Sequence, residues 1–418
     1  MKNILEYKNY RTEERGWTEA FQEAIRALVK EGGGILQIPA GIYETCSIQL
    51  YSNTQLFLEP GAELHYISDC EKYETVELGY EGRFSSMYMP LIYAKNAENV
   101  SVCGYGVLNG QGEYWWKNRD GLLYKRPYMI HFENCRNVKV QNLHLINSPA
   151  WTVHPHYCYN VEISGISIEN PKDSPNTDGI NPESCKNVKI SNCNIDVGDD
   201  CITLKAGTEE TPVLAPCENI TIANCNMVHG HGGVVIGSEM SGTVRNVTIS
   251  NCIFQDTDRG IRVKTRRGRG GAMEHILVNN IIMDRVLCPF VFNMFYQCGA
   301  VGADYKEKKP YPVTECTPKI RDIQIQNVMA EHVTAAAAFF YGLPEMPIEN
   351  IVLSDCRIVM NGGEEGGYPA MMEDIPLMRA QGAYLRFAKN VTFRNLRVIR
   401  AEGEEICTDD TVVGFTGL

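Results

Sequence analysis

The sequence contains no apolar run long enough to cross a membrane. No stretch of its 418 residues approaches the roughly 18 consecutive apolar residues that a membrane helix needs. The start of the chain, Met1 to Asn9, also lacks the apolar core of a signal peptide, although a leader already removed would leave no trace. We therefore expect a soluble protein with no membrane partner, located in the cytoplasm.

Cysteine patterns typical of zinc sites are also missing. The chain has 16 cysteines, but neither a CxxC pair nor a Cys/His spacing of the zinc type. Four cysteines follow Asn or Asp at the same place in successive repeats, and small buried hydrophobes in a reducing compartment explain them better than disulfides do. The sequence therefore predicts no metal and no cofactor. These four cysteines are Cys193, Cys225, Cys252 and Cys356.

The chain has no overall excess of positive charge, since 39 Lys and Arg face 51 Asp and Glu, a net charge of −12. Residues 259–269 nevertheless hold six cations in eleven positions. A cationic strip on an acidic protein attracts small anions better than duplex nucleic acid, which usually meets a broadly basic face. We expect no nucleic-acid partner. A solvated charged loop is the alternative for Arg266 to Arg269, and a much weaker one for Arg262 and Lys264.

A linker rich in Pro, Gly or Ser is absent from residue 99 to 395, and a repeat fills this stretch instead. An Asn followed by alternating apolar residues recurs, at intervals of 23, 27, 32, 27 and 29 residues between positions 137 and 275. We therefore expect one domain, residues 1–418. The clearest copies begin at Asn99, Asn137, Asn160, Asn187, Asn219, Asn246, Asn350 and Asn390, and degenerate copies begin at His275 and Asp322.

Each copy has the period of a β-strand, and one short strand per coil cannot bury its apolar face unless neighbouring coils stack. Leucine-rich repeats need a consensus that is absent, and propeller blades need about 40 residues each. The repeat therefore predicts an all-β parallel β-helix, in which the Asn side chains form a ladder without a catalytic role. Apolar residues at Phe21, Ala24, Ile25 and Leu28 predict a capping helix at about 18–31, and about 402–418 is expected as a C-terminal tail.

Four short motifs lie at similar intervals within this repeat. From Asp178 to Asp200 is 22 residues, from Asp200 to His231 is 31, and from His231 to Arg262 is 31. If the chain winds with about this period, these groups meet on one face. The motifs are Asn176-Thr177-Asp178-Gly179, Gly198-Asp199-Asp200, Gly230-His231-Gly232 and Arg262-Val263-Lys264.

Strand alternation predicts which side chains point into the β-helix. Ile180, Ile202, Val234 and Ile261 match as inward positions, so that Asn181, Thr203 and Arg262 point outward, with Lys205 and Lys264 further along the same face. Coils lie about 4.8 Å apart. Carboxylates one coil apart, with some lateral offset, would then lie roughly 6.5–9.5 Å from one another, as in inverting glycosidases.

An inverting glycosidase needs one protonated carboxyl for the leaving oxygen and one ionised carboxylate to activate water. Asp178, Asp199 and Asp200 cannot all ionise cheaply at close range, which favours a proton on one of them. His231 can tune that proton. Arg262 and Lys264 can bind a substrate carboxylate.

These motifs, in this order, resemble the signature of glycoside hydrolase family 28, the polygalacturonases, and the resemblance covers most of the chain, including Gly41-Ile42-Tyr43 and Gly110-Gln111-Gly112. It implies a single-stranded right-handed β-helix of the pectin-lyase-like type. It also implies that Asp199 is the general acid, that Asp178 and Asp200 position and deprotonate the water, and that His231 supports the acid. Arg262 and Lys264 would bind galacturonate, with Arg-Val-Lys replacing the usual Arg-Ile-Lys, and Tyr296 is the candidate for the family's tyrosine.

Other residues are candidates with a structural alternative. His154 lies 24 residues before Asp178 and is either a substrate contact or a structural histidine. Glu239 and Lys205 could touch substrate. Asn181, like Asn176, is more often a brace for the backbone. Trp115 and Trp116 could stack on a sugar but are more readily explained as a packed pair, and Asp196 as a turn residue.

The resemblance implies hydrolysis of α-1,4-galacturonosidic bonds in pectic oligosaccharides. Exo action from the non-reducing end is favoured, because an enzyme without an export signal meets imported oligosaccharides, and because segments Glu71 to Tyr88 and Cys298 to Cys316 could close a groove. Rhamnogalacturonan or xylogalacturonan is the alternative substrate. A Ca²⁺-dependent pectate lyase and a non-catalytic solenoid are the rival classes. The sequence does not predict the oligomeric state.

Overall fold

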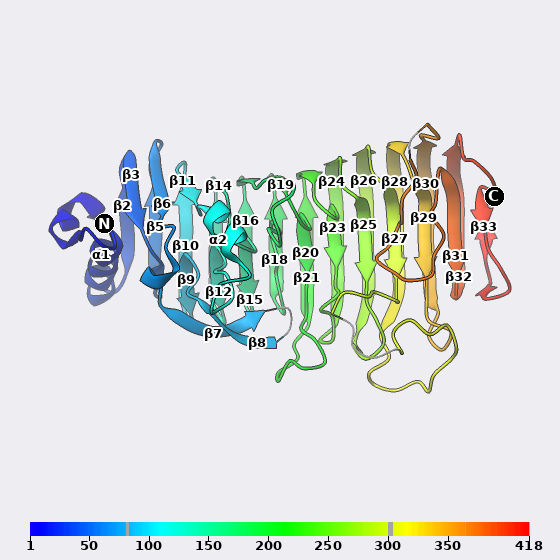
Figure 1. The fold of residues 1–418 in the computed structure, drawn as a ribbon, viewed down its shortest axis with the longest axis horizontal. Helices are drawn as coiled ribbons and strands as arrows, with labels where there is room; N and C mark the ends of the chain where they lie inside the picture. The colour runs from blue at the N-terminus through cyan, green and yellow to red at the C-terminus, as the bar shows by residue number, and fades with distance from the viewer. Residues whose placement is uncertain (81–82, 300–303, 364, 418) are drawn as a thin grey trace. The chain divides into compact units, whose positions relative to one another are not determined.

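The computed structural model describes residues 1–80, 83–299, 304–363 and 365–417. It divides the chain into two compact units, Met1–Asp199 and Asp200–Leu418. Within each unit, strands far apart in sequence stack in parallel, coil upon coil (Figure 1). The fold is therefore the right-handed parallel β-helix that the sequence predicts, and the organisation as one domain stays a prediction.

Helix α1 (Thr18–Lys30) covers the first coils of unit 1, as expected from the helical spacing at about 18–31. Its apolar side, including Phe21, Ile25 and Leu28, is completely or almost completely buried. The helix packs against β2 (Gly34–Ile38) and β4 (Ile48–Leu50). It ends before three glycines with positive φ, a conformation that costs other residues more than glycine.

The coils of unit 1 carry up to three short strands each. Each strand pairs in parallel with the corresponding strand of the next coil. The first ladder is β2, β5 (Thr54–Leu58), β10 (Glu98–Gly104), β13 (Arg136–Gln141), β16 (Tyr159–Ser164) and β18 (Lys186–Ser191). The second is β3 (Gly41–Thr45), β6 (Ala62–Tyr66), β11 (Val107–Asn109), β14 (His144–Ile146), β17 (Ser167–Glu169) and β19 (Asn194–Val197). The third is β4, β9 (Ile92–Lys95), β12 (Ile130–Glu133) and β15 (Val153–His156).

Smaller elements complete unit 1. Strand β1 (Lys2–Asn3) pairs with β2, and β7 (Thr75–Tyr80) pairs with β8 (Arg83–Tyr88) as an antiparallel hairpin outside the coils. Two 3₁₀ helices, Ile4–Tyr10 and Cys70–Lys72, and helix α2 (Gly112–Asn118) lie between strands. The hairpin comes from the segment Glu71 to Tyr88, and the expectation that this segment closes one end of a groove stays a prediction.

Unit 2 has two parallel ladders. One contains β21 (Cys217–Ala223), β22 (Asn226–His229), β24 (Val244–Gln255), β26 (Ala272–Asp284), β28 (Lys319–Val333), β30 (Ile348–Met360), β32 (Ala388–Ile399), β34 (Val412–Val413) and β35 (Thr416–Gly417). The other contains β20 (Ile202–Leu204), β23 (Val234–Ile236), β25 (Arg259–Lys264), β27 (Cys288–Asn293), β29 (Ala336–Tyr341), β31 (Gln381–Arg386) and β33 (Ile406–Cys407). The expected C-terminal tail thus adds short strands to both ladders.

The repeated Asn forms the predicted ladder of stacked amides. Asn137 donates to Asn99 at 3.0 Å, and Asn160 donates to Asn137 and Asn187 to Asn160 at 3.1 Å each. All four have φ between 55° and 60°, the left-handed region that Asn tolerates better than most residues. Asn therefore recurs here for its backbone conformation as well as for its amide.

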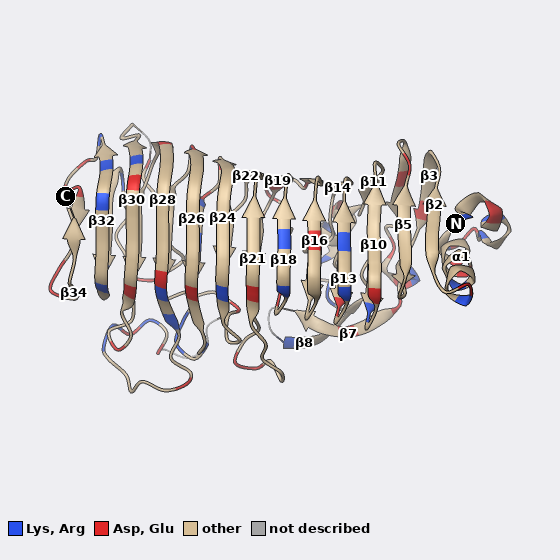
Figure 2. Ribbon diagram, turned by 180° about the vertical axis from the view of Figure 1, so that it is seen from behind, with Lys and Arg blue, Asp and Glu red and all other residues tan. Residues whose placement is uncertain are grey.

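Charged side chains of opposite sign follow one another at the start of successive long strands in unit 2 (Figure 2). Glu218 on β21 binds Arg245 on β24 at 2.8 Å, and Glu274 on β26 binds Arg321 on β28 at 2.7 Å. Opposite charges on paired strands stabilise a sheet by about 0.2–1 kcal/mol each and penalise a shifted register. The row thus helps to keep these coils in phase.

The cysteines are free, and eleven of the 16 are buried, as the sequence predicts for small hydrophobes. Within the described ranges, the structure contains no helix with both the length and the apolar character that would take it across a bilayer.

Candidate active site

Asp178 is held by one hydrogen bond from the preceding coil and one from its own segment. Its carbonyl oxygen accepts from the backbone amide of Thr152, in the preceding coil, at 2.8 Å. The amide of Asn181 donates to Oδ2 of Asp178 at 3.0 Å. Asp178 is 3% exposed and Asn181 has no exposed surface. Asn181 therefore orients the carboxylate, and its expected contact with substrate is wrong because a sugar cannot reach it.

Asp199 follows Gly198, which approaches the Asp178 segment very closely. The Gly198 amide donates to Oγ1 of Thr177 at 3.3 Å. A Cβ at position 198 would lie 2.4 Å from the carbonyl oxygen of Ser174, so no larger residue fits without a shift. The Gly of the Gly-Asp-Asp motif thus brings Asp199 beside Asp178. The Asp199 side chain is only half-buried, which leaves it accessible to a ligand.

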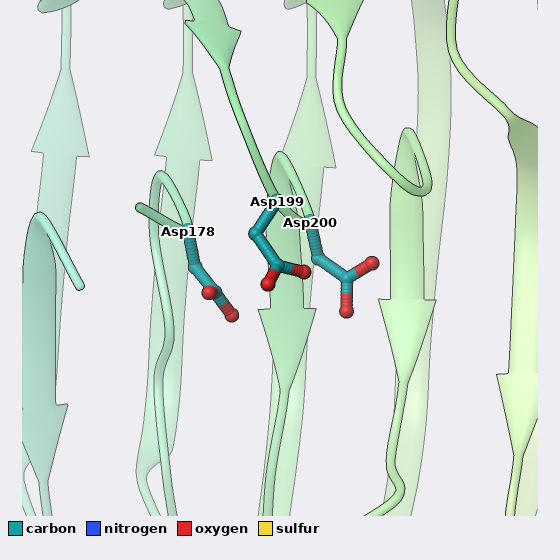
Figure 3. Close-up of side chains that lie close together, drawn as sticks. All are labelled: Asp178, Asp199 and Asp200. Atoms are coloured by element: carbon teal, nitrogen blue, oxygen red, sulfur yellow. The ribbon is translucent and has the colours of Figure 1, made fainter. Parts of the chain in front are cut away.

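The three acidic side chains lie close together in the structure (Figure 3). One carboxylate oxygen from each of Asp178, Asp199 and Asp200 lies within 4.8 Å of the others. This corrects the separation of roughly 6.5–9.5 Å expected from coil spacing. The reason is local: Asp199 and Asp200 are neighbours in sequence, and Gly198 permits a closer approach than the regular distance between coils.

Asp200 begins unit 2 and is bound there by two cations. Its Oδ1 accepts from Arg262 Nη1 at 3.0 Å, and its Oδ2 accepts from Lys264 Nζ at 2.8 Å. All three side chains are less than one-tenth exposed. Burial alone would raise the pKa of Asp200, but the charges of Lys264 and Arg262 lower it well below its ordinary value. Asp200 is therefore ionised, which suits a base and excludes the role of general acid.

The register in unit 2 confirms the predicted side-chain directions. Ile202 pairs with Val234 and Val234 with Ile261, all inside the coils, while Thr203, Val235 and Arg262 share the next row. The outward side chains are nevertheless covered by another segment. Arg262 Nη2 lies 3.2 Å from Sδ of Met371. Arg259 of the same strand donates to the carbonyl oxygens of Tyr368 and Pro369 at 2.9 and 3.0 Å.

His231 is the most accessible of the predicted groups, with its side chain 52% exposed. Its Nδ1 lies 2.8 Å from Oδ2 of Asp258, which also binds Arg259 at 3.0 Å. Burial opposes ionisation of Asp258, but His231 and Arg259 lower its pKa below the ordinary value. Asp258 is not among the residues predicted from the sequence, although it lies 27 residues after His231, one coil interval. A carboxylate on Nδ1 orients the ring.

Tyr296, the candidate for the family's tyrosine, lies beside the two cations. Its ring is 5.1 Å from Lys264 Nζ and 5.8 Å from the Arg262 guanidinium carbon. Burial raises the pKa of the Tyr296 hydroxyl, which therefore stays protonated and able to donate. Cation–π contacts of this kind hold the two cations in place.

Lys205 and Glu239 pair with each other instead of presenting open charges. Lys205 Nζ lies 2.9 Å from Oε2 of Glu239, and both side chains are at most one-tenth exposed. Burial opposes ionisation of Glu239, but Lys205 lowers its pKa overall. The pair fixes the strands around the site, and direct contact of either residue with a sugar stays a prediction.

The solvated loop considered for Arg266 to Arg269 is also wrong. Arg266 and Arg269 are less than one-tenth exposed, and both bind Glu209. Arg267 binds Glu345 through Nε at 2.6 Å and Nη2 at 3.0 Å. The cationic strip is thus largely neutralised by acidic partners. Part of the neighbouring segment Cys298 to Cys316, expected to close a groove, lies outside the described residues.

His154 is a structural histidine. It has no exposed surface, and its Nε2 lies 3.1 Å from Oε2 of Glu183 while its Nδ1 lies 3.1 Å from Nδ1 of His131. The alternative of a substrate contact is therefore wrong. Trp115 is likewise completely buried and packs edge-on against Tyr73, so it cannot stack on a sugar, while Trp116 donates from Nε1 to the carbonyl oxygen of Ser148 at 3.1 Å.

A cation could in principle bind the three grouped carboxylate oxygens, because hard divalent ions prefer such ligands. Asp200, however, is already neutralised by Arg262 and Lys264. Two positive charges beside the cluster weaken its attraction for a further cation. The donor set therefore suits proton transfer better than a resident metal.

Comparison with known proteins gives a consistent result. Residues 76–371 match the family model for glycosyl hydrolases family 28. A probable polygalacturonase from Vitis vinifera is 36% identical over 355 residues, 82% of this chain and 70% of that protein. A probable polygalacturonase from Arabidopsis thaliana is 32% identical over 265 residues, 62% of this chain and 54% of that protein.

Solved structures show the same fold. An exopolygalacturonase from Thermotoga maritima is 29% identical and superposes with a TM-score of 0.78, covering 96% of this chain and 92% of that one. A family 28 exopolygalacturonase from Yersinia enterocolitica, at 18% identity, has a TM-score of 0.80 over 99% of this chain and 77% of that one and supports the fold alone. From the matched residues and these relatives, the chain belongs to glycosyl hydrolases family 28 and is a glycoside hydrolase.

Proposed function

We propose that the protein hydrolyses the α-1,4-galacturonosidic bonds of pectic oligosaccharides, releasing galacturonate from the non-reducing end with inversion. The observation that carries the proposal is Asp200, a buried and ionised carboxylate joined by one peptide bond to the accessible Asp199. The Vitis vinifera relative is a probable polygalacturonase, and the Thermotoga maritima relative is an exopolygalacturonase. Both relatives support a pectic substrate.

Asp199 is the general acid of the proposed mechanism. Asp178 and Asp199 lie too close together for both to ionise cheaply, which favours a proton on the more accessible Asp199. Asp199 gives this proton to the glycosidic oxygen as the bond to the anomeric carbon breaks. A water molecule attacks the same carbon and loses its proton to Asp178 or Asp200. Exchange with solvent then returns the carboxyls to their starting state.

Inversion rests on how Asp200 is bound. Each of its two oxygens accepts a charged hydrogen bond, one from Arg262 and one from Lys264. A carboxylate neutralised in this way is a poor nucleophile for a covalent intermediate but can still order a water molecule. The short separation of the carboxylates does not itself favour inversion. Proton NMR of the first product anomer decides, since inversion of an α-linkage gives the β-anomer.

Arg262 and Lys264 are assigned to the substrate carboxylate. Both cations bind Asp200 and so lie next to the cluster of three acidic side chains where the bond would be cleaved. Guanidinium groups bind carboxylates with bidentate geometry, which fixes a uronate more firmly than a neutral sugar. A galacturonate residue would therefore be held beside the acid while the bond is broken.

A product profile tests the activity. The purified protein would be given trigalacturonate, polygalacturonate, rhamnogalacturonan oligosaccharides and xylogalacturonan, with Asp199→Asn as control. We expect galacturonate as the first product of trigalacturonate and polygalacturonate, and a loss of about 10²–10⁴-fold for Asp199→Asn. Rapid shortening of polygalacturonate before monomer appears would refute exo action. Activity confined to a rhamnose- or xylose-bearing substrate would identify the alternative substrate.

The two rival classes lose their support. Family membership makes the chain a hydrolase, so the Ca²⁺-dependent lyase is wrong. A non-catalytic solenoid gives no reason for an accessible acid beside an ionised carboxylate. The cytoplasmic location stays a prediction.

A further inference from the structure

Unit 1 contains a pocket of about 620 Å³ beside the segment that carries Asp178. This volume lies within the range of roughly 300–1,000 Å³ typical of small-molecule sites. Its walls come from the hairpin β7–β8, from the chain between residues 119 and 126, and from Asn176. Asn176 precedes Asp178 by two residues, so the pocket adjoins the acidic end of unit 1.

The pocket carries an excess of positive charge. Arg119, Lys125 and Arg126 line it together with a single acidic residue, Asp120, which pairs with Arg119 at 3.5 Å. The Asp120 side chain is 95% exposed, so this pair is weak and Arg119 can exchange it for a ligand carboxylate. Arg126 is buried and donates to the carbonyl oxygens of Pro149 and Pro175 and to Oδ1 of Asn176 at 2.7–2.8 Å. Arg126 thus builds the wall and links it to the Asp178 segment. An anion is the ligand that this charge favours.

Lys125 is held in position from two directions. Its backbone donates to Ser86 and accepts from Tyr88, at 3.2 and 3.0 Å, which adds it to the edge of β8. Its ammonium lies 5.2 Å from the ring centre of Tyr80. Tyr80 in turn stacks on Trp151 at 5.8 Å. An ammonium fixed in this way loses less conformational freedom when it binds a carboxylate.

The remaining lining suits a sugar better than a simple anion. Ser85 offers a hydroxyl, Ser86 donates its own hydroxyl to Glu77 and keeps its capacity to accept, and Tyr124 adds an amphipathic ring. Polar groups that can both donate and accept match the hydroxyls of a pyranose ring. A phosphate or sulfate ion would use only the donors and would leave most of the volume unfilled.

We propose that this pocket binds one hexuronate residue of the substrate, with its carboxylate on Lys125 and Arg119 and its hydroxyls near Ser85 and Ser86. The proposal rests on the proposed function, because it supplies the site for a uronate next to the one being cleaved or for the terminal uronate itself. The hairpin β7–β8 and residues 119–126 would then select an acidic over a neutral sugar at this position.

The test compares Lys125→Met and Arg119→Gln with the wild type on trigalacturonate and on its fully methyl-esterified form. Lys189→Met, an exposed lysine on β18 outside the pocket, is the matched control. We expect KM for trigalacturonate to rise about tenfold in each pocket variant with kcat nearly unchanged, because a contact made equally in ground and transition states is lost. On the ester, the variants and the wild type should agree within about twofold.

Calorimetric titration of galacturonate and galactose into the Asp199→Asn protein gives a second readout without turnover. Wild-type pocket residues should favour galacturonate, and Lys125→Met should reduce the preference, while Arg262 and Lys264 retain the part that they supply. Equal effects of Lys125→Met on trigalacturonate and its ester, or an unchanged preference in the titration, would overturn the proposal. A wild-type protein that cleaves no pectic substrate would instead overturn the proposed function, and the titration would still test the pocket.

Discussion

Replacing Asp200 by asparagine should destabilise the protein as well as inactivate it. Asn has nearly the same shape, but it removes the negative charge that Arg262 and Lys264 both bind at 2.8–3.0 Å. The two cations then remain buried, at 3% and 8% side-chain exposure, with their shared carboxylate replaced by a neutral amide. Like charges in such surroundings repel strongly, because little solvent screens them.

Breaking a buried ion pair from one side costs about 3–5 kcal/mol of unfolding free energy. Unfolding of a chain of 418 residues carries an entropy of about 0.9 kcal/mol/K, at roughly 2.1 cal/mol/K per residue. The melting temperature of Asp200→Asn should therefore fall by about 3–6 °C at pH 7, measured by scanning calorimetry. Asp410→Asn, an exposed carboxylate of the same unit, should change it by less than about 1 °C.

The difference in melting temperature between the wild type and Asp200→Asn should depend on pH in one direction. The pKa of Asp200 is lower in the folded protein than its ordinary value of about 3.9, so its stabilisation is fully present above that value. It is lost as the pH falls through the folded pKa. The gap in melting temperature between wild type and Asp200→Asn should stay constant from about pH 5 to 8 and narrow below about pH 4.

A second variant separates charge from packing. Adding Lys264→Met to Asp200→Asn removes one of the two repelling cations, so the double variant should melt above Asp200→Asn, by about 1–2 °C. A melting temperature for Asp200→Asn within about 1 °C of the wild type would refute the buried network as a source of stability. So would a gap that widens in acid.

Three further variants test other parts of the structure. Asp258→Asn should lower kcat/KM by about tenfold, because His231 loses the carboxylate that orients its ring; an unchanged kcat/KM would exclude this role. If the buried pair is charged, Glu239→Gln should lower the melting temperature by about 3 °C. The double variant with Lys205→Met should lower it less, because it leaves no unpaired cation. Asn160→Ala should lower the free energy of unfolding by about 2–3 kcal/mol, measured by calorimetry, and Asn160→Gly should lower it less. Both variants lose the ladder amide, but only Ala is strained at a φ of 57°. Equal losses for the two variants would contradict this.

The repeat makes the fold predictable from sequence. Each copy joins an Asn, which tolerates the left-handed turn, to a strand whose alternate residues are apolar, and these two features set the phase of every coil. Ile202, Val234 and Ile261 can be matched from the sequence alone because only one alignment of the copies buries all three. Residues that share this periodic phase are placed correctly for the same reason.

Contacts made by the loops could not be predicted in this way. Met371 and the carbonyl oxygens of Tyr368 and Pro369 reach Arg259 and Arg262 from 109 or 110 residues away in sequence, and nothing periodic marks them. The burial of the outward cations, and hence the strength of their pairing with Asp200, depends on that segment. A repeat tells which face a side chain occupies but not what lies over that face.

The second glycine of the Gly-His-Gly motif lies beside the side chains of Val235 and Arg262. Arg262 shares a row with Val235 and Thr203, so its side chain must pass the β23 coil, about 9.6 Å for two coil spacings, to reach Asp200. A Cβ on Gly232 would lie 2.5 Å from Val235 and 3.4 Å from the Arg262 chain. The clash is with Val235, whereas 3.4 Å from Arg262 is ordinary van der Waals contact. Glycine at position 232 therefore leaves room for Val235, beside the arginine that reaches Asp200.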